Sequence, residues 1–353
     1  MNELNHRLNL SNAESKLLTA DFTYESVSEC LIGKDYFYKI IKTSDLYKIN
    51  SALTEKLLNQ IPINNSATGF VKGKCYFDFL EAHRKNEYFI RLDIRSFFHN
   101  IKVDDVSDAI SSYLPLINLK NNKESLNFVL DKLTIKVNDS FKNAAVKDKQ
   151  IIPIGFKSSP VLSNIIFRKI DIQIQKYCHS HNVTYTRYAD DMLFSSKKEN
   201  IIHSSEFIKK ISIYIFQLSL KLNTNKTIKA KKLLSLNGYI IDSKTETIRI
   251  SNKKLIVINK LINMLMIKKA TTSDILKKLF SNDIKKLPDN YKNNSSFYQK
   301  YCKDQVFNKV VGYRSYLISL IKYSQEHNNC VAKVYINKYT KIIDRLNEIV
   351  NKY

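Results

Sequence analysis

The stretch TYTRYADDMLFSS, residues 184–196, places two aspartates, Asp190 and Asp191, between two short apolar runs. Adjacent like charges repel each other, so such a pair in a sheet costs stability unless something offsets the repulsion. Asp also favours turns, because its side chain hydrogen-bonds nearby backbone and tolerates unusual dihedral angles. A second pair in the same chain, in VDDV at residues 103–106, has the character of acidic residues at a helix start. An Asp-Asp pair alone therefore does not distinguish a turn from a cation site, and the rest of the sequence has to decide.

Alternating apolar residues predict three strands around this pair. Thr184–Tyr188 and Met192–Ser196 form two strands joined tightly as a hairpin, with the aspartates at its tip. Tyr88–Ile94 (YFIRLDI) is a third strand, with three aliphatic side chains on one face and Asp93 on the other. The order strand, helix, hairpin, helix, strand predicts an α+β sheet with helices on one face. In such a sheet the hairpin tip lies beside the end of the Asp93 strand.

Two amphipathic helices flank the hairpin. Ser159 before Pro160 is typical of a helix start, with the Ser as the capping residue and the Pro in the first turn. Residues 1–60 read as mostly helical, and the chain beyond about residue 252 reads as helical and rich in Lys and Tyr. In the two helices that flank the hairpin, apolar residues recur at helical spacing. They are Leu162, Ile166, Ile170, Ile174 and Tyr177 in the helix before it, and Phe207, Ile211, Ile215, Leu218 and Leu222 in the helix after it.

The composition indicates a polyanion-binding protein. The 353 residues carry a formal net charge of +24, and residues 251–353 hold 20 Lys and Arg against 7 Asp and Glu. Nucleic acid is the commonest partner of such a field, although a lysine-rich genome bias accounts for part of it. The five cysteines show no CxxC or CxxH spacing, and no segment resembles a signal peptide or a membrane span. We therefore expect a cytoplasmic protein that does not bind membranes.

Three converging aspartates suit a two-metal site. Asp93, Asp190 and Asp191 would hold two Mg²⁺ ions, with Mn²⁺ as an alternative, at a spacing of roughly 3.5–4 Å. Two such ions activate an attacking hydroxyl and stabilise the leaving phosphate oxygen. The metals would then offset the repulsion between the adjacent carboxylates.

These segments resemble the motifs of reverse transcriptases, in particular the bacterial retron and defence-associated group, over roughly residues 64–320. Tyr188-Ala189-Asp190-Asp191 matches the YxDD box, and RLDIRSFF at residues 91–98 looks like the first catalytic box. The resemblance implies that Asp93 is the third metal ligand and that Tyr188 contacts substrate. It also implies that Phe98 is an aromatic gate beneath the sugar, which excludes a 2′-hydroxyl and favours deoxynucleotides.

Further segments resemble other boxes of the family, in the right order. GFVKGK at residues 69–74 is similar to the fingers segment whose basic side chains grip the triphosphate, with two solvated lysines in a turn as the alternative. The resemblance assigns the following residues: Lys72 and Lys74 to the triphosphate; Gly155, Ser159, Pro160 and Asn164 to the box that lines nucleotide and template; Lys226 to protonation of the pyrophosphate; Gly238 and Tyr239 to the primer grip; and Arg314 to the helical thumb.

Three positions depart from the family pattern. Ile154 stands where most relatives have a Gln that touches the nucleotide. FLEAH at residues 79–83 keeps only the His of the retron Asn-Ala-x-x-His segment, and His83 reads equally as a structural histidine. Leu236-Asn237-Gly238 stands in place of the retron Val-Thr-Gly triplet. The two missing retron signatures favour another defence-associated reverse transcriptase over a true retron enzyme.

The sequence thus predicts a right-hand polymerase, with fingers and palm in residues 1–250 and a helical basic thumb in residues 251–353. The expected function is an RNA-directed DNA polymerase that extends a 3′ end with dNTPs. The expected role is antiviral defence with a dedicated noncoding RNA, together with a partner protein or a second copy of the chain. Two alternatives stay open: template-independent DNA synthesis, which Ile154 keeps in play, and a catalytically silent RNA-binding scaffold.

Overall fold

The chain divides into two units. The computed structural model describes residues 6, 8–22, 24–33, 35–114, 119–199, 201–285, 287–293, 295–327 and 329–352. Contacts group Met1–Ala82 with Tyr88–Lys229 in the first unit, and His83–Glu87 with Ala230–Tyr353 in the second. The boundary expected near residue 250 stays a prediction, and each unit is described by itself.

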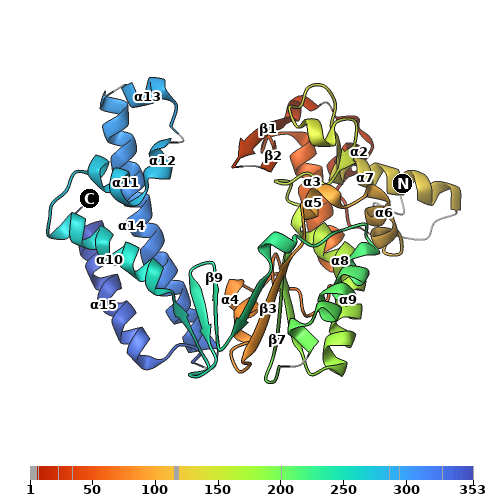
Figure 1. Ribbon diagram of the computed structural model, residues 1–353. Helices are drawn as coiled ribbons and strands as arrows, with labels where there is room; N and C mark the ends of the chain where they lie inside the picture. Colours follow the sequence, from red (N-terminus) through yellow and green to blue (C-terminus); the bar gives the residue numbers. More distant parts are fainter. Residues whose placement is uncertain are drawn as a thin grey trace. The chain divides into compact units, whose positions relative to one another are not determined.

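The first unit mixes helices with short antiparallel sheets, as the α+β class requires (Figure 1). Its helices are α2 (Asn12–Thr19), α3 (Asp45–Lys56), α4 (Tyr76–Glu81), α5 (Phe97–Asn100), α6 (Val103–Ser111), α7 (Leu119–Leu133), α8 (Ser159–Ser180) and α9 (Ser205–Phe216). Its strands are β1 (Val27–Ile32), β2 (Asp35–Ile40), β3 (Tyr88–Asp93), β4 (Ile135–Lys136), β5 (Gln150–Ile151), β6 (Thr184–Tyr188) and β7 (Asp191–Ser196), and β8 (Ile228–Lys231) spans the junction between the units.

The sheet that matters for function has the strand order β6-β7-β3-β8. β6 and β7 form the predicted hairpin, and β3 pairs antiparallel with β7, so that the two strands lie side by side in Figure 1. The β3–β7 register places Asp93 directly opposite Asp191. Residues almost a hundred positions apart therefore meet at one end of this sheet.

The predicted apolar stripes of α8 and α9 form much of the core. Ile166, Ile170 and Ile174 of α8 are buried, and they belong to the same cluster as Ile90 and Phe194 of the sheet. The stripe predicted for α9 is likewise buried at its first three positions. Helix spacing therefore identified the side chains that α8 and α9 pack into the core.

The capping role predicted for Ser159 is wrong. Helix α8 begins at Ser159 itself, with Ser158 before it and no side-chain cap. The Ser159 hydroxyl is buried and donates instead to the Pro153 carbonyl at 2.7 Å. Pro160 does occupy the first turn, where its missing N–H costs nothing.

The mostly helical reading of residues 1–60 is wrong in its middle third. β1 and β2 form an antiparallel hairpin there, and Gly33 adopts a φ of 69° in its turn. The alternating pattern of β2 buries Tyr38 and Ile40, which pack into the main core. In this segment, tertiary packing outweighs the local preference for a helix.

The second unit combines a small sheet with long helices. Its strands, in the order β11-β10-β9, are β9 (Leu233–Leu236), β10 (Tyr239–Asp242) and β11 (Thr247–Ile250). Its helices are α10 (Asn252–Met266), α11 (Thr272–Leu279), α12 (Ser281–Lys285), α13 (Asp289–Asn293), α14 (Ser295–Glu326) and α15 (Lys333–Val350). Tyr339 of α15 ties the helices to the sheet, because its buried hydroxyl accepts from the Ile250 amide at 2.9 Å. Among the residues that the structure describes, no helix combines the length and apolar character needed to cross a membrane.

Candidate active site

Three aspartates gather where β3 and β7 meet the hairpin turn. Asp191 is the first residue of β7 and faces Asp93, while the Ile94 amide donates to the Asp190 carbonyl at 3.0 Å. The turn residue Ala189 has a φ of 55°, which lets the chain reverse within two residues. The sheet therefore brings together all three residues that the sequence assigned to metal binding.

Two cations of the chain reach the same carboxylates. Arg91 donates from Nη2 to Asp93 Oδ2 at 3.2 Å and also pairs with Asp191 Oδ1. Lys226 Nζ lies 3.1 Å from Asp93 Oδ2, and it is brought there because the Asn223 amide donates to the Asp93 carbonyl at 2.7 Å. Arg91 was not among the site residues predicted from the sequence, although its place two residues before Asp93 puts it on the same strand face.

The charge of the cluster is not balanced by these contacts alone. Burial, together with the negative charges of Asp191 and Asp93, raises the pKa of Asp190 to about 6. Burial also raises the pKa of Asp191, although Arg91 opposes this effect. Two adjacent carboxylates with raised pKa values mark a place where an added positive charge is stabilising.

The carboxylates fit divalent ions chemically. Asp93 Oδ1 is buried and has no hydrogen-bond partner within the described part of the chain, so one oxygen still lacks a donor or an ion. Hard divalent cations prefer such carboxylate oxygens. Within the same described part, no group of three His, Cys, Asp or Glu side chains is already arranged around a single ion position. Arg91 contacts Asp93 and Asp191, and Lys226 contacts Asp93. We infer that the three aspartates would hold the ions and that both cations would then shift.

A buried ion pair supports the hairpin from behind. Arg187 donates from Nε and Nη2 to both carboxylate oxygens of Asp171 on α8, at 2.9 and 2.6 Å, and neither side chain is exposed. The Tyr185 hydroxyl donates to the same carboxylate at 2.7 Å. Arg187 Nη1 donates to the Ala189 carbonyl at 3.0 Å, so the pair reaches the turn that carries Asp190.

A loop ahead of α4 packs directly on the hairpin. The Arg187 amide donates to the Ser66 carbonyl and the Thr68 amide donates to the Arg187 carbonyl, both at 2.8 Å. A Cβ on Gly69 would lie 2.8 Å from the Ala189 amide nitrogen, which is closer than real Cβ contacts. Only glycine therefore lets this loop lie against the turn.

Aromatic rings border the aspartates. The backbone turns sharply after β3, because Ser96 adopts a φ of 47°, and Phe97 and Phe98 follow at the start of α5. Phe97 is buried in the core, whereas Phe98 is partly exposed and meets the ring of Phe70 at 6.4 Å. Tyr188 also lies near Phe70, at 6.0 Å between ring centroids.

The other candidates of the first unit fall into two groups. Lys72 and Asn164 line a cavity of about 530 Å³ beside the loop. Lys74 instead donates to the Asn65 and Ala67 carbonyls at 2.9 and 3.0 Å, so its ammonium closes its own loop. Gly155 adopts a φ of 116° and packs on β2, where a Cβ would lie 2.7 Å from the Tyr38 carbonyl oxygen. The contacts of Lys74, Gly155 and Ser159 are thus structural.

The candidates of the second unit lie on its sheet and on α14. Gly238 adopts a φ of 88° between β9 and β10, and Tyr239 stacks on Tyr316 at 4.7 Å. The ammonium of Lys254 lies over the Tyr316 ring at 5.5 Å. Arg314 donates to the Asn347 side chain, so it joins α14 to α15. Tyr239 is itself buried, whereas Tyr316 and Lys254 are partly exposed, and an aromatic ring beside a cation suits nucleic acid.

His83 is completely buried, and burial lowers its pKa to about 3. The His83 imidazole is therefore neutral in the native state, whereas in the unfolded chain it becomes protonated below about pH 6.5. The contribution of His83 to stability is complete above that pH and declines as the pH falls. We expect about 2 kcal/mol of this contribution to be lost between pH 7 and pH 5.

Urea unfolding of the wild type and His83→Gln at pH 7 and pH 5 checks this expectation. The glutamine variant stays neutral, so its free energy of unfolding should fall less between the two pH values. Equal losses in both proteins would show that His83 titrates normally.

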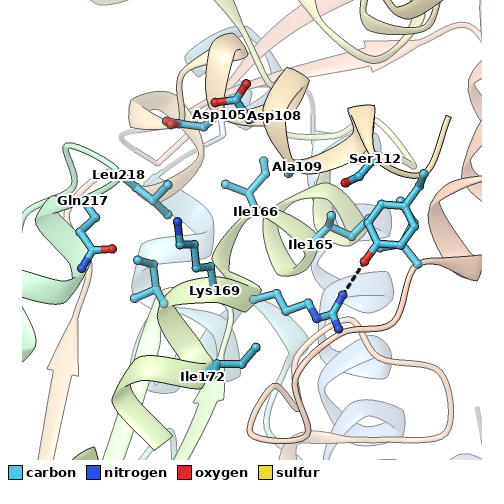
Figure 2. A pocket seen from close by; sticks show the side chains of 14 residues that line it. Asp105, Asp108, Ala109, Ser112, Ile165, Ile166, Lys169, Ile172, Gln217 and Leu218 are labelled. Atoms are coloured by element: carbon cyan, nitrogen blue, oxygen red, sulfur yellow. Dashed lines mark hydrogen bonds between the residues drawn. The ribbon is translucent and has the colours of Figure 1, made fainter. Parts of the chain in front are cut away.

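The second Asp pair shares one property with Asp190, because burial raises the pKa of Asp105, but it lies on a different kind of element. Asp104 and Asp105 lie in the first turn of α6, as predicted. Asp105 and Asp108 line a pocket of about 540 Å³ whose wall also includes Lys169 of α8 (Figure 2). The pair lies on a helix and not on a strand, and Figure 2 shows Asp105 and Asp108 above Ile165, Ile166 and Ile172 of α8. This pair therefore serves as a matched control for Asp190 and Asp191.

Comparison with known proteins gives the class to which this site belongs. A family profile described as reverse transcriptase (RNA-dependent DNA polymerase) matches residues 35–250, and the chain belongs to this family. Its α+β architecture is that of a right-hand polymerase. Domains of this family generally use divalent metal ions.

The similar curated proteins are retron reverse transcriptases. The Ec83 enzyme of Escherichia coli is 27% identical over 198 residues, which cover 55% of this chain and 61% of that protein. The Ec73 enzyme of the same organism is 30% identical over 149 residues, or 41% of this chain and 44% of that protein. The Ec86 enzyme is 25% identical over 224 residues, or 63% of each. The chain thus spans less than two thirds of the length of each relative.

Telomerase from Candida albicans, solved in complex with a fragment of telomeric RNA, is a distant structural neighbour. It covers 96% of this chain and 65% of its own, at 12% identity and a TM-score of 0.47. This similarity is too low to support a functional argument.

Proposed function

We propose that this protein is an RNA-directed DNA polymerase that adds dNTPs to a 3′ end. The observation that carries the proposal is the convergence of Asp93 with Asp190 and Asp191 at the β3–β7 end, in a chain of the reverse transcriptase family. A scaffold protein has no physical need to gather three carboxylates at a place where burial and neighbouring negative charges raise the pKa of Asp190.

Each side chain has a distinct role in this proposal. Asp93, Asp190 and Asp191 would hold divalent ions, which, when bound, activate the 3′ hydroxyl and stabilise charge on the leaving phosphate. Lys226, which contacts Asp93, is placed to donate a proton to the pyrophosphate. Lys72 is exposed beside the loop and provides a cation for the triphosphate.

The biological role is proposed on the retron relatives and on charge. We propose that the protein acts in antiviral defence on a dedicated noncoding RNA, together with a partner protein or a second copy. The net charge of +24 supports RNA binding. Sequencing the RNA that copurifies with the protein tests this proposal: one enriched noncoding species is expected, and random cellular RNA would contradict it.

One assay tests the polymerase activity directly. The purified protein is incubated with Mg²⁺ and all four dNTPs, with and without an RNA template and primer, and the products are sequenced. DNA complementary to the RNA is the expected result. DNA made without a template would instead support the second candidate, template-independent synthesis, which Ile154 in place of the usual Gln favours. No product with several templates would refute the polymerase and favour a silent RNA-binding scaffold.

Phe98 should govern sugar selection. Its partly exposed ring lies at the start of α5, five residues after Asp93, and the family resemblance implies that a bulky group here meets a 2′-hydroxyl. We expect Phe98→Ala to raise ribonucleotide incorporation, relative to deoxynucleotide incorporation, by about 10–100-fold. Single-nucleotide extension with each dNTP and its rNTP measures the ratio. An unchanged ratio would remove Phe98 from the gate.

A further inference from the structure

Phe70 is an exposed aromatic residue in a costly backbone conformation. Its side chain is 46% exposed, and its φ of 60° lies in the left-handed region that residues other than Gly, Asn and Asp rarely adopt. A glycine would adopt this conformation without strain. Neither core packing nor backbone preference therefore explains a phenylalanine at this position.

The neighbours of Phe70 hold it in that conformation. Thr68 is fixed to the hairpin, because its amide and its hydroxyl both donate to the Arg187 carbonyl. The Gly69 carbonyl accepts from Asn164 Nδ2 of α8 at 2.9 Å. The ring of Phe70 is thus presented by a backbone that is anchored on two sides, which is typical of strain kept at a functional position.

The ring lies among groups already proposed to contact the substrate. Its centroid is 6.4 Å from that of Phe98 and 6.0 Å from that of Tyr188, which directly precedes the turn carrying Asp190. Phe70 also lines the cavity of about 530 Å³ that contains Lys72 and Asn164. That volume lies within the range of small-molecule sites.

The cavity offers polar partners as well as a ring. Asn164 is 1% exposed, and its Oδ1 has no hydrogen-bond partner among the described residues, so an acceptor is left unpaired at the cavity wall. Lys72 supplies a positive charge at the same cavity. A ring, an acceptor and a cation match the base, its N–H groups and the phosphates of a nucleotide.

We propose that Phe70 is a specificity-determining residue of the nucleotide site, whose ring contacts the base and sugar of the incoming dNTP beside Phe98. This inference rests on the proposed polymerase function and adds a residue to its substrate site. Because stacking depends on a planar ring, tyrosine should replace Phe70 and alanine should not. Removing one base–aromatic contact should weaken dNTP binding by about 10-fold.

Equilibrium binding tests the proposal without requiring turnover. The probe is dTTP, titrated into protein bound to poly(rA) and a dideoxy-terminated oligo(dT) primer. Phe70→Ala should raise the dissociation constant of dTTP about 10-fold, and Phe70→Tyr should leave it within a factor of two of wild type. Phe216→Ala is the matched control, because Phe216 is a 63% exposed phenylalanine at the end of α9, and it should bind dTTP as wild type does.

A glycine variant separates the ring from the backbone. Phe70→Gly should lose dTTP affinity as Phe70→Ala does, yet unfold at a higher temperature than Phe70→Ala, because glycine relieves the positive φ. A residue kept only for structure would show no loss of dTTP affinity in either variant.

Three results would overturn the inference. The first is an unchanged dTTP dissociation constant in Phe70→Ala; the second is a change confined to template–primer binding, which would make Phe70 a strand contact. The third is a wild-type complex that binds no dTTP. Failure of the polymerase proposal alone would look different from these three results. The wild type would bind dTTP, with the expected dependence on Phe70, yet it would not extend an unblocked primer.

Discussion

Asp190→Asn should reduce dNTP incorporation by at least about 10³-fold, the scale seen when a central catalytic group is removed. Asp190 sits in the hairpin turn beside Asp191 and Asp93, and an amide carries no charge for a divalent ion. Primer extension at saturating dNTP, with Mg²⁺, measures the loss. Wild-type rates in the variant would refute the metal assignment.

The same substitution should make the metal-free protein more stable. The pKa of Asp190 is about 6 in the folded protein, against an ordinary value of 3.8, so folding favours the protonated form. Ionised Asp190 therefore lowers the free energy of unfolding. This loss of stability is absent below about pH 4, grows as the pH rises to 6, and is complete above pH 6. The shift corresponds to about 1–3 kcal/mol once partial exposure is allowed for.

Measuring activity and stability together separates chemistry from misfolding. Urea unfolding in EDTA at pH 7.5 should show Asp190→Asn to be more stable than wild type, with the difference vanishing near pH 4. Asp105→Asn is the control from the second Asp pair, and it should keep full activity. A variant that is both inactive and unstable would mean that Asp190 acts through the fold.

The second large effect concerns the buried pair behind the hairpin. Asp171→Leu leaves the Arg187 guanidinium buried without its carboxylate, which should lower the free energy of unfolding by about 3–5 kcal/mol. The double variant Arg187→Met/Asp171→Leu removes both charges and should recover most of that loss, because apolar side chains of similar size replace a buried ion pair at little cost.

Denaturant unfolding of the two single variants and the double variant measures this interaction energy. The double variant should still incorporate dNTPs more slowly than wild type, since the Arg187 contact to the Ala189 carbonyl is lost along with the charge. Additive losses in the double variant would show that the two residues stabilise the fold independently.

Local patterns in the sequence predicted those structural features that depend only on residues close together in the chain. The alternation in residues 184–196 gave the hairpin, and the helical spacing in α8 gave its buried face, because both are properties of a single element. The place of Asp93 beside Asp191 followed from the expected order of strands.

Contacts between distant segments were not predictable in the same way. Arg91 and the Arg187–Asp171 pair were missed because a charged residue does not reveal its partner in a single sequence. Lys74 reads as a free cation in GFVKGK, and only the folded loop shows its ammonium among backbone carbonyls. The β1–β2 hairpin was missed because its packing on the core outweighed local helix preference.

The pairing of Thr68 with Arg187 also fixes when the site can form during synthesis. The two residues are 119 positions apart, so at 5–20 residues per second the loop at Thr68 waits roughly 6–24 s for the hairpin to be made. Until then its amides and the exposed ring of Phe70 have no native surface to dock on. During this interval the loop is open to chaperones and proteases, and the active site is assembled only after the hairpin has been translated.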